Sequence, residues 1–273
     1  MTQVLKVLML GDVIGKTGRA LFARHIQSLK TEYLLDAVIV NGENSGDAGV
    51  GITPDIVAAF KKQGADVVTS GNHLWDDKSI IPYLEKNTDL IRPANFPASC
   101  PGVGMTFFTC KGFQVGVINL MGRVFMQPTL DCPFIEAERL LKKSAAITPI
   151  MLVDFHAEAT SEKLGLAYFL EGKVTALVGT HTHTLTNDAR ILPGGTAYVT
   201  DLGMSGSRHS VIGFDAPLFV QGFITAMGVD PRVVTEPPYI MTGVIITIDP
   251  LTGKALAIEN FVKHDDQLLE GLS

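Results

Sequence analysis

Short apolar runs, each ending at a glycine or a polar residue, recur along this chain, and several of them lead into helical patterns. The first three runs span residues 4–10, 36–40 and 65–69, and a polar turn follows each of them. Runs of this length that are rich in Val, Ile and Leu are typical of buried strands. Because strands and helices alternate here, this part of the chain predicts parallel neighbours joined by right-handed crossovers, as in α/β folds.

The pattern changes after Arg92. Residues 106–110 and 114–120 predict an antiparallel pair, and residues 242–248 and 254–264 predict a closing hairpin. We therefore expect two β-sheets with helices outside them rather than one doubly wound sheet. Further strands are expected at 149–155, 173–178 and 196–200, and helices up to about Lys30, from an N-cap at Thr53, near 78–86, and at 134–145 and 161–170.

The composition is that of a compact protein. Hydrophobic residues make up 46% of the 273 and charged residues 18%, which argues against disorder, and no linker divides residues 1–273, so we expect a single domain. The net charge of -6 argues against duplex nucleic acid or an anionic membrane as a partner. The cysteines form no CxxC pair and the apolar run at 7–10 is too short for a signal or membrane span, which predicts a cytoplasmic location. The high apolar content also predicts a homo-oligomer.

Polar residues with ligand chemistry follow the expected strands. Each has an ordinary explanation by itself, as a turn cap, a solvated charge or a core histidine. Ligands collect at the carboxyl ends of strands in α/β sheets, however, so their shared position predicts one site. Carboxylate, amide and imidazole groups together suit divalent transition metals such as iron, manganese or zinc. The residues are Asp12, Glu43, Asn72, His156, His181 and His183.

The last two of these lie in the segment Gly179-Thr180-His181-Thr182-His183. Extended backbone there would put both imidazoles on one side, where they could serve one ion or two neighbouring ions. The six residues are enough ligands for two ions. Two divalent ions would outweigh the charges of Asp12 and Glu43, so the site would stay positive and attract an anionic phosphate.

The order of these motifs resembles a known family. Gly11-Asp12, Gly42-Glu43-Asn44, Gly71-Asn72-His73, His156 and the segment at 179–183 resemble the calcineurin-like metallophosphoesterase superfamily, and within it the YmdB-like bacterial phosphodiesterases. The resemblance covers essentially the whole chain. It implies an α/β fold, a metallophosphoesterase-type sandwich of two mixed β-sheets flanked by helices. The chain departs from the wider superfamily at Ile14, where a histidine is usual, and at Glu43, where an aspartate is usual.

Carried over by position, the resemblance implies two metal ions per chain, with iron or manganese favoured and zinc a further option. A water bridging the ions, with a lowered pKa, would attack phosphorus in line. His73 would protonate the leaving oxygen or stabilise the charged transition state. The implied substrates are small phosphodiesters, including cyclic nucleotides and their 2′,3′-cyclic forms. The implied ligands are Asp12, Glu43, Asn44 and His183 for one ion, and Glu43, Asn72, His156 and His181 for the other, with Glu43 bridging.

Two alternatives stay open at this point. Gly11 to Thr17 follows a strand as a P-loop would, but it has three residues between its glycines where the motif needs four. A metal-dependent nucleotide-binding regulatory protein with little turnover would explain the ligands, although it leaves His73 without a role. Replacing His73 by Ala separates this hypothesis from an enzyme, because only an enzyme would lose turnover.

A polar segment near residue 205 is the remaining candidate. It contains Asp201, Ser205, Arg208 and His209, and each of these by itself is best explained as part of a solvated loop. Arg208 is the one we single out as a substrate-binding residue, because a guanidinium matches the geometry of a phosphate.

Overall fold

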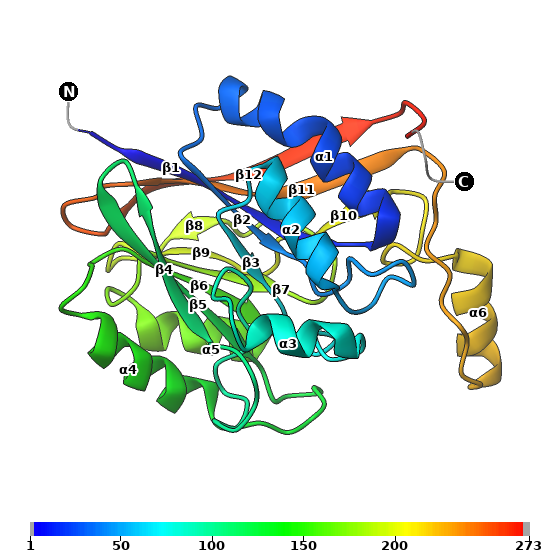
Figure 1. The fold of residues 1–273 in the computed structure, drawn as a ribbon, viewed down its shortest axis with the longest axis horizontal. Helices are drawn as coiled ribbons and strands as arrows, with labels where there is room; N and C mark the ends of the chain where they lie inside the picture. The colour runs from blue at the N-terminus through cyan, green and yellow to red at the C-terminus, as the bar shows by residue number, and fades with distance from the viewer. Residues whose placement is uncertain (1–2, 270–273) are drawn as a thin grey trace.

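Residues 3–269, which the computed structural model describes, form four layers, with two β-sheets packed face to face between two layers of helices (Figure 1). Both sheets mix parallel and antiparallel pairs, so the predicted α/β sandwich is confirmed. The first sheet consists, in spatial order, of β12 (Ala255–Asp265), β11 (Tyr239–Ile248), β10 (Met204–Ser207), β1 (Leu5–Val13), β2 (Ala37–Asn41) and β3 (Val67–Thr69). The second consists of β4 (Met105–Cys110), β5 (Phe113–Met121), β6 (Met151–His156), β7 (Ala176–Thr180), β9 (Ala197–Val199) and β8 (Arg190–Ile191).

Helices cover the outer face of each sheet. α1 (Gly15–Glu32) and α2 (Pro54–Gln63) pack on the first sheet, and α4 (Pro133–Ser144) and α5 (Thr160–Leu170) pack on the second (Figure 1). A short 3-10 turn, η1 (Lys78–Ile80), leads into α3 (Ile81–Leu84), and α6 (Ala216–Thr225) stands at one edge of the molecule. None of the described helices combines the length and apolar character that crossing a membrane requires.

Side-chain alternation along the strands builds the core. In β1, Leu8 and Leu10 join the apolar cluster under α1 and α2, whereas Val7 and Met9 join the cluster between the two sheets. Successive side chains of a strand point to opposite faces, so a continuous apolar run serves two cores at once. This explains why the runs in the sequence are almost uninterrupted.

Parallel pairing brings the carboxyl ends of the strands together. Asp12 pairs with Asn41 across β1 and β2, and Asn41 pairs with Thr69 in β3. In the second sheet His156 pairs with Thr180 across β6 and β7. Polar residues at these strand ends therefore gather at one edge of each sheet, as the sequence predicts.

Three features differ from the sequence prediction. β1 continues beyond Leu10 through Asp12 to Val13, because these two residues pair with β10, a strand that the sequence does not predict. α6 is also unpredicted, and it starts where the side chain of Asp215 accepts a hydrogen bond from Leu218 N.

The predicted N-cap of α2 is confirmed, since Thr53 Oγ1 accepts from Ile56 N at 3.4 Å.

Candidate metal centre

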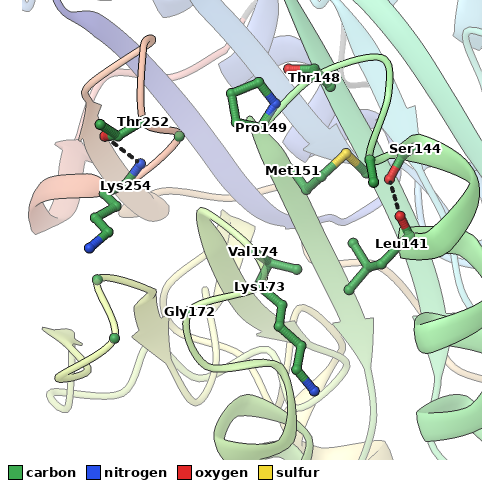
Figure 2. A pocket seen from close by; sticks show the side chains of 14 residues that line it. Leu141, Ser144, Thr148, Pro149, Met151, Gly172, Lys173, Val174, Thr252 and Lys254 are labelled. Carbon is green, nitrogen blue, oxygen red and sulfur yellow. Dashed lines mark hydrogen bonds between the residues drawn. The ribbon is translucent and has the colours of Figure 1, made fainter.

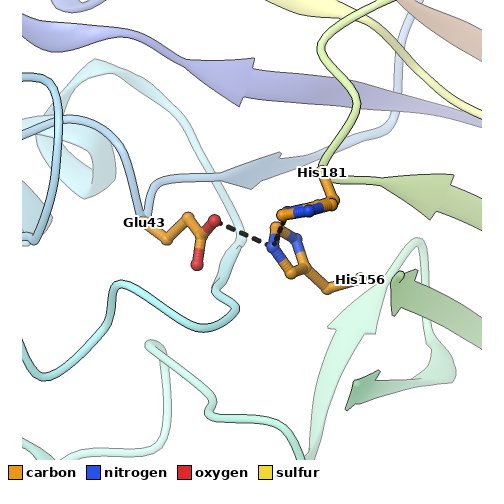
Figure 3. A group of neighbouring side chains, drawn as sticks. All are labelled: Glu43, His156 and His181. Atoms are coloured by element: carbon orange, nitrogen blue, oxygen red, sulfur yellow. Dashed lines mark hydrogen bonds and ion pairs between the residues drawn. The ribbon is translucent and has the colours of Figure 1, made fainter. Parts of the chain in front are cut away.

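Three side chains converge on one nitrogen of His156, at the carboxyl end of β6. Glu43 Oε1 lies 2.9 Å from His156 Nε2 and His181 Nδ1 lies 3.1 Å from it (Figure 3). Asn72 Oδ1 lies 2.9 Å from the same nitrogen. An imidazole nitrogen carries either one proton or one lone pair, so it can satisfy one partner fully and not three. Gly71 makes the crowding possible, because a Cβ at this position would overlap both Glu43 Oε2 and the His156 ring.

A second group of side chains adjoins the first. Asp12 Oδ1 lies 3.8 Å from His183 Nε2 and 4.0 Å from His156 Nδ1, distances too long for hydrogen bonds. Within residues 3–269, Asp12 Oδ1 and Asn44 Oδ1 are buried without a hydrogen-bond partner. Buried polar atoms are rarely left unpaired, so these two oxygens indicate a position for a missing cation.

Hydrogen bonds fix which ring nitrogens carry lone pairs. His183 Nδ1 lies 2.9 Å from Ile212 O, a pure acceptor, so Nδ1 carries the proton and Nε2 faces Asp12 with a lone pair. Thr180 Oγ1 donates to Asp154 Oδ1 at 2.7 Å and lies 3.0 Å from His156 Nδ1, from which it must accept. His156 therefore keeps a proton on Nδ1, and Nε2 is the nitrogen that would offer a lone pair to a metal ion once it loses its own proton.

The pKa values describe a site whose carboxylates stabilise positive charge next to them. Burial opposes ionisation of Glu43, but the charge of His156 and its hydrogen bond lower the pKa of Glu43 to about 2. Burial also opposes protonation of His156, yet Glu43 raises the pKa of His156 to about 9. Burial raises the pKa of Asp12 to about 6, despite the nearby imidazoles. Burial and the neighbouring His156 lower the pKa of His181 to about 3, so this ring is neutral, as a metal ligand requires.

The donor set fits divalent transition metals. Two carboxylates, two amide oxygens and three imidazoles lie at this edge of the sheets, and Glu43, His156 and His181 place ligand atoms within 4.8 Å of one another. His156 Nε2 is crowded by its partners at this edge, and the two unpaired oxygens lie at the same edge. Bound cations would satisfy both groups of atoms. The structure therefore brings together all seven predicted ligand residues.

The two histidines of the segment at 179–183 reach the site through a turn rather than a strand. β7 ends at Thr180, and His181 and His183 have positive φ angles of 101° and 60°. The expectation of extended backbone is therefore wrong. Positive φ at a residue with a side chain costs about 1–3 kcal/mol and is concentrated at functional sites. The turn sends His181 toward His156 and His183 toward Asp12.

A buried ion pair that sequence reasoning missed supports this turn. Lys163 Nζ of α5 donates to Asp201 Oδ2 at 2.7 Å, and both side chains are fully buried. The same oxygen accepts from Thr182 N at 3.1 Å, between the two histidines. The expected solvated loop is wrong for Asp201 and also for Ser205, because both residues are fully buried and Ser205 belongs to β10.

A second missed residue, Asp154, stands behind His156. Its carboxylate is buried and accepts from Thr180 Oγ1, from Thr69 Oγ1 and, at 3.2 Å, from Asn41 Nδ2. It therefore ties the ends of β2 and β3 to β6 and orients His156 through Thr180. The sequence does hold a signal, because Asp154 lies two residues before His156 and strand alternation puts both on one face.

A cavity of about 210 Å³ opens onto the site. His73 lies beside it, with 36% of its side chain exposed, and its Nδ1 is 2.8 Å from Asp76 Oδ2. Its backbone N–H donates to Glu43 Oε2 at 3.0 Å. Arg208 is exposed and lines a separate cavity, which shares only His183 with the first. The cavity at the site is lined by Glu43, Asn44, Val50, His73, His181, His183, Ile212, Phe214, Phe219 and Pro231.

A larger cavity of about 270 Å³ lies at the opposite, amino ends of β6 and β7 (Figure 2). Lys173 and Lys254 are its charged residues, and no carboxylate or imidazole of residues 3–269 lines it. Because ligands of α/β sheets bind outside the carboxyl ends of the strands, the smaller cavity is the better candidate for chemistry.

Comparison with known proteins agrees with the fold and with the motifs. Residues 8–261 match the family described as YmdB-like protein. A Bacillus subtilis protein named 2′,3′-cyclic-nucleotide 2′-phosphodiesterase is 43% identical over 264 residues, which cover 97% of this chain and 99% of that protein. The crystal structure of a phosphatase from Mycoplasma pneumoniae matches with a TM-score of 0.91 at 33% identity, covering 97% of this chain and 95% of that one. A hypothetical protein from Thermus thermophilus matches with a TM-score of 0.89 at 36% identity, covering 96% and 100%. The chain therefore belongs to the YmdB-like protein family.

Proposed function

We propose that this protein is a metal-dependent phosphodiesterase that hydrolyses small nucleotides, including 2′,3′-cyclic nucleotides. The main support is the convergence of Glu43, Asn72 and His181 on His156 Nε2, beside the unpaired oxygens of Asp12 and Asn44. The activity for which the Bacillus subtilis relative is named, at 43% identity over nearly the whole chain, supports the substrate class. A cytoplasmic location, a single domain and a homo-oligomeric state stay predictions.

Two divalent ions, iron or manganese before zinc, would be held in two overlapping sets. Asp12, Glu43, Asn44 and His183 would hold one, and Glu43, Asn72, His156 and His181 the other. Ions bound there would lower the pKa of a water and neutralise the charge of a phosphate. The protein's own contribution is to keep the imidazole lone pairs on the correct nitrogens, through Ile212 O for His183 and Thr180 for His156.

His73 is the proposed catalytic residue. Because Asp76 occupies Nδ1, Nε2 is the ring nitrogen that would meet a substrate in the cavity. From there it could donate a proton to the leaving oxygen or stabilise negative charge at the phosphate. Its backbone N–H holds Glu43 at the same time, so a substitution that spares the backbone separates the two roles.

Metal content tests the centre directly. Freshly purified wild-type protein should contain about two transition-metal ions per chain, and Glu43→Ala should lose most of them, because Glu43 belongs to both proposed sets. Elemental analysis of both proteins gives the result. If metal-free wild-type protein stays folded and gains no activity on 2′,3′-cyclic AMP when manganese or iron is added, the proposal is wrong.

Turnover by His73→Ala tests the catalytic role. We expect hydrolysis of 2′,3′-cyclic AMP to fall about 10²- to 10⁴-fold, the usual contribution of a general acid, while metal content stays unchanged. His209→Ala is the matched control, since His209 is exposed and lines neither cavity near the site. Unchanged turnover in His73→Ala would remove His73 from the mechanism. Nucleotide binding without any turnover by wild-type protein would support a regulatory protein instead.

A further inference from the structure

The cavity at the candidate metal centre has a polar and an apolar side. The polar side consists of candidate ligands and His73, and the apolar side of Val50, Ile212, Phe214, Phe219 and Pro231. A phosphate with small polar substituents has no surface that matches this apolar wall. A nucleotide has both parts, a charged phosphate and a flat base with apolar faces.

A buried aromatic ring supports the apolar wall. Phe214 is only 5% exposed and belongs to a buried cluster with Ile14 and Met204. Phe219 of α6 stacks on Phe214, with ring centroids 5.7 Å apart and 23° between the ring planes. Phe219 is therefore a half-buried aromatic ring that lines the cavity and is supported from behind by a buried one.

The wall is also fixed relative to the candidate metal centre. His183 Nδ1 donates to Ile212 O at 2.9 Å, so a residue of the wall is bonded directly to a candidate ligand. The cluster behind the wall contains Ile14, which directly follows β1 and its residue Asp12. The wall and the candidate metal centre therefore lie at a fixed distance from each other. A phosphate at the centre and a second group against the wall could occupy the same cavity.

We propose that Phe219, with Ile212 and Pro231, forms the base subsite of this enzyme, on which the nucleobase stacks while the phosphate lies at the metal centre. This inference rests on the proposed function. Because the wall offers faces rather than hydrogen-bonding side chains, it accepts purines and pyrimidines alike, and binding depends on the presence of a base. Stacking of one base on an aromatic side chain accounts for about 5- to 150-fold in affinity.

Equilibrium binding to the metal-loaded protein tests the subsite without requiring turnover. Calorimetry would compare adenosine 3′-phosphate with ribose 3′-phosphate, which lacks the base. Wild-type protein should bind the nucleotide at least about fivefold more tightly, and Phe219→Ala should remove this preference while binding ribose 3′-phosphate as before. Ile224→Ala is the matched control on the same helix, because Ile224 is 76% exposed and lies outside the cavity.

Phe219→Leu keeps the apolar bulk without the aromatic face, and it should lose part of the preference even if Phe219→Ala fails to fold. The subsite is overturned if wild-type protein binds both ligands equally, or if Phe219→Leu leaves the preference intact. Hydrolysis of 2′,3′-cyclic AMP, measured on the same preparations, judges the proposed function separately. If the protein prefers the nucleotide but does not hydrolyse 2′,3′-cyclic AMP, the proposed enzymatic activity is wrong and the base subsite is supported.

Discussion

Two fully buried carboxylates lie at neighbouring strand ends, and their surroundings differ sharply. Asp201 Oδ2 accepts from Lys163 Nζ at 2.7 Å and from Thr182 N at 3.1 Å, and its Oδ1 accepts from Gly203 N at 2.9 Å. Asp12 Oδ2 accepts from His181 N at 3.1 Å, while its Oδ1 has no partner in the part of the chain that the structure describes.

Both carboxylates therefore hold the backbone of the same histidine turn, but only one has a cation of its own. A buried charge needs a partner to offset the loss of water, and Lys163 provides it for Asp201. Within residues 3–269 Asp12 has no ammonium or guanidinium partner, and its basic neighbours are the imidazoles of His183 and His156, 3.8 and 4.0 Å from its Oδ1. The difference separates a carboxylate that stabilises the fold from one that we propose as a metal ligand.

The comparison predicts opposite outcomes for two matched substitutions in metal-free protein. Asp201→Asn should lower the free energy of unfolding by about 3–5 kcal/mol, because it leaves Lys163 as a buried charge without a partner. Asp12→Asn should change it little, because burial raises the pKa of Asp12 to about 6 and its charge therefore does not stabilise the metal-free fold, but it should abolish metal retention. Urea denaturation with chelator present, followed by elemental analysis after adding metal, measures both.

The double variant Lys163→Met/Asp201→Asn is the control for the first substitution. It removes the unpaired charge, so it should recover part of the lost stability. If Asp12→Asn destabilises the metal-free protein as much as Asp201→Asn does, then Asp12 is a structural residue and the contrast between the two is wrong.

The sequence was sufficient to predict the strand ends and the residues that follow them. Asp12, Glu43, Asn72 and His156 are recognisable because each follows an apolar run of strand length. Parallel pairing does the rest, because it brings strand ends that lie far apart in the sequence to one edge. Local patterns and a general rule about α/β sheets thus predict where these side chains meet.

The supports of the site could not be predicted in the same way. Lys163 and Asp201 pair across 38 positions, from a helix to a strand end, and no local pattern links them. The positive φ angles of His181 and His183 arise from tertiary hydrogen bonds to their turn rather than from a glycine. Phe219 lies in a helix whose own residues are not buried, so no apolar stripe marks it.

A smaller effect distinguishes two threonines that share Asp154. Thr69 and Thr180 both donate to its carboxylate, but only Thr180 also contacts His156. Thr180→Val should cost about 1–3 kcal/mol of stability, because it removes the donor to Asp154 Oδ1, and Thr69→Val should cost less, because Asn41 Nδ2 still donates to Oδ2. Only Thr180→Val should also weaken metal binding, by about 10- to 100-fold, because the His156 ring would lose the hydrogen bond that orients it. Competition with a chromogenic chelator measures this, and equal metal affinity in the two variants would exclude orientation through Thr180.

Asp265 extends the comparison to a carboxylate near the surface, where the effect should be smallest. Its Oδ2 lies 2.9 Å from Arg24 Nη1 and 2.7 Å from His25 Nε2, and its Oδ1 accepts from Gln267 N. Partial burial opposes its ionisation, but the hydrogen bonds from Gln267, His25 and Arg24 prevail and lower the pKa of Asp265 below its ordinary value. A carboxylate with a lowered pKa in the folded state contributes stability above the unfolded pKa of about 4, and this stability is lost as the pH falls through the folded value.

At pH 7, therefore, Asp265→Asn should lower the free energy of unfolding by about 1 kcal/mol or less, because solvent screens the partly exposed Arg24. The deficit relative to wild type should shrink as the pH falls below about 4, where protonation removes the same charge from wild-type protein. Urea denaturation at several pH values measures this, and Asp266→Asn, at the exposed neighbouring residue, should show no such trend. A deficit that does not change with pH would mean that Asp265 acts through packing and hydrogen-bond shape. Charge pairing would then contribute to stability at the fully buried Asp201 and not at Asp265, whose partner Arg24 is partly exposed.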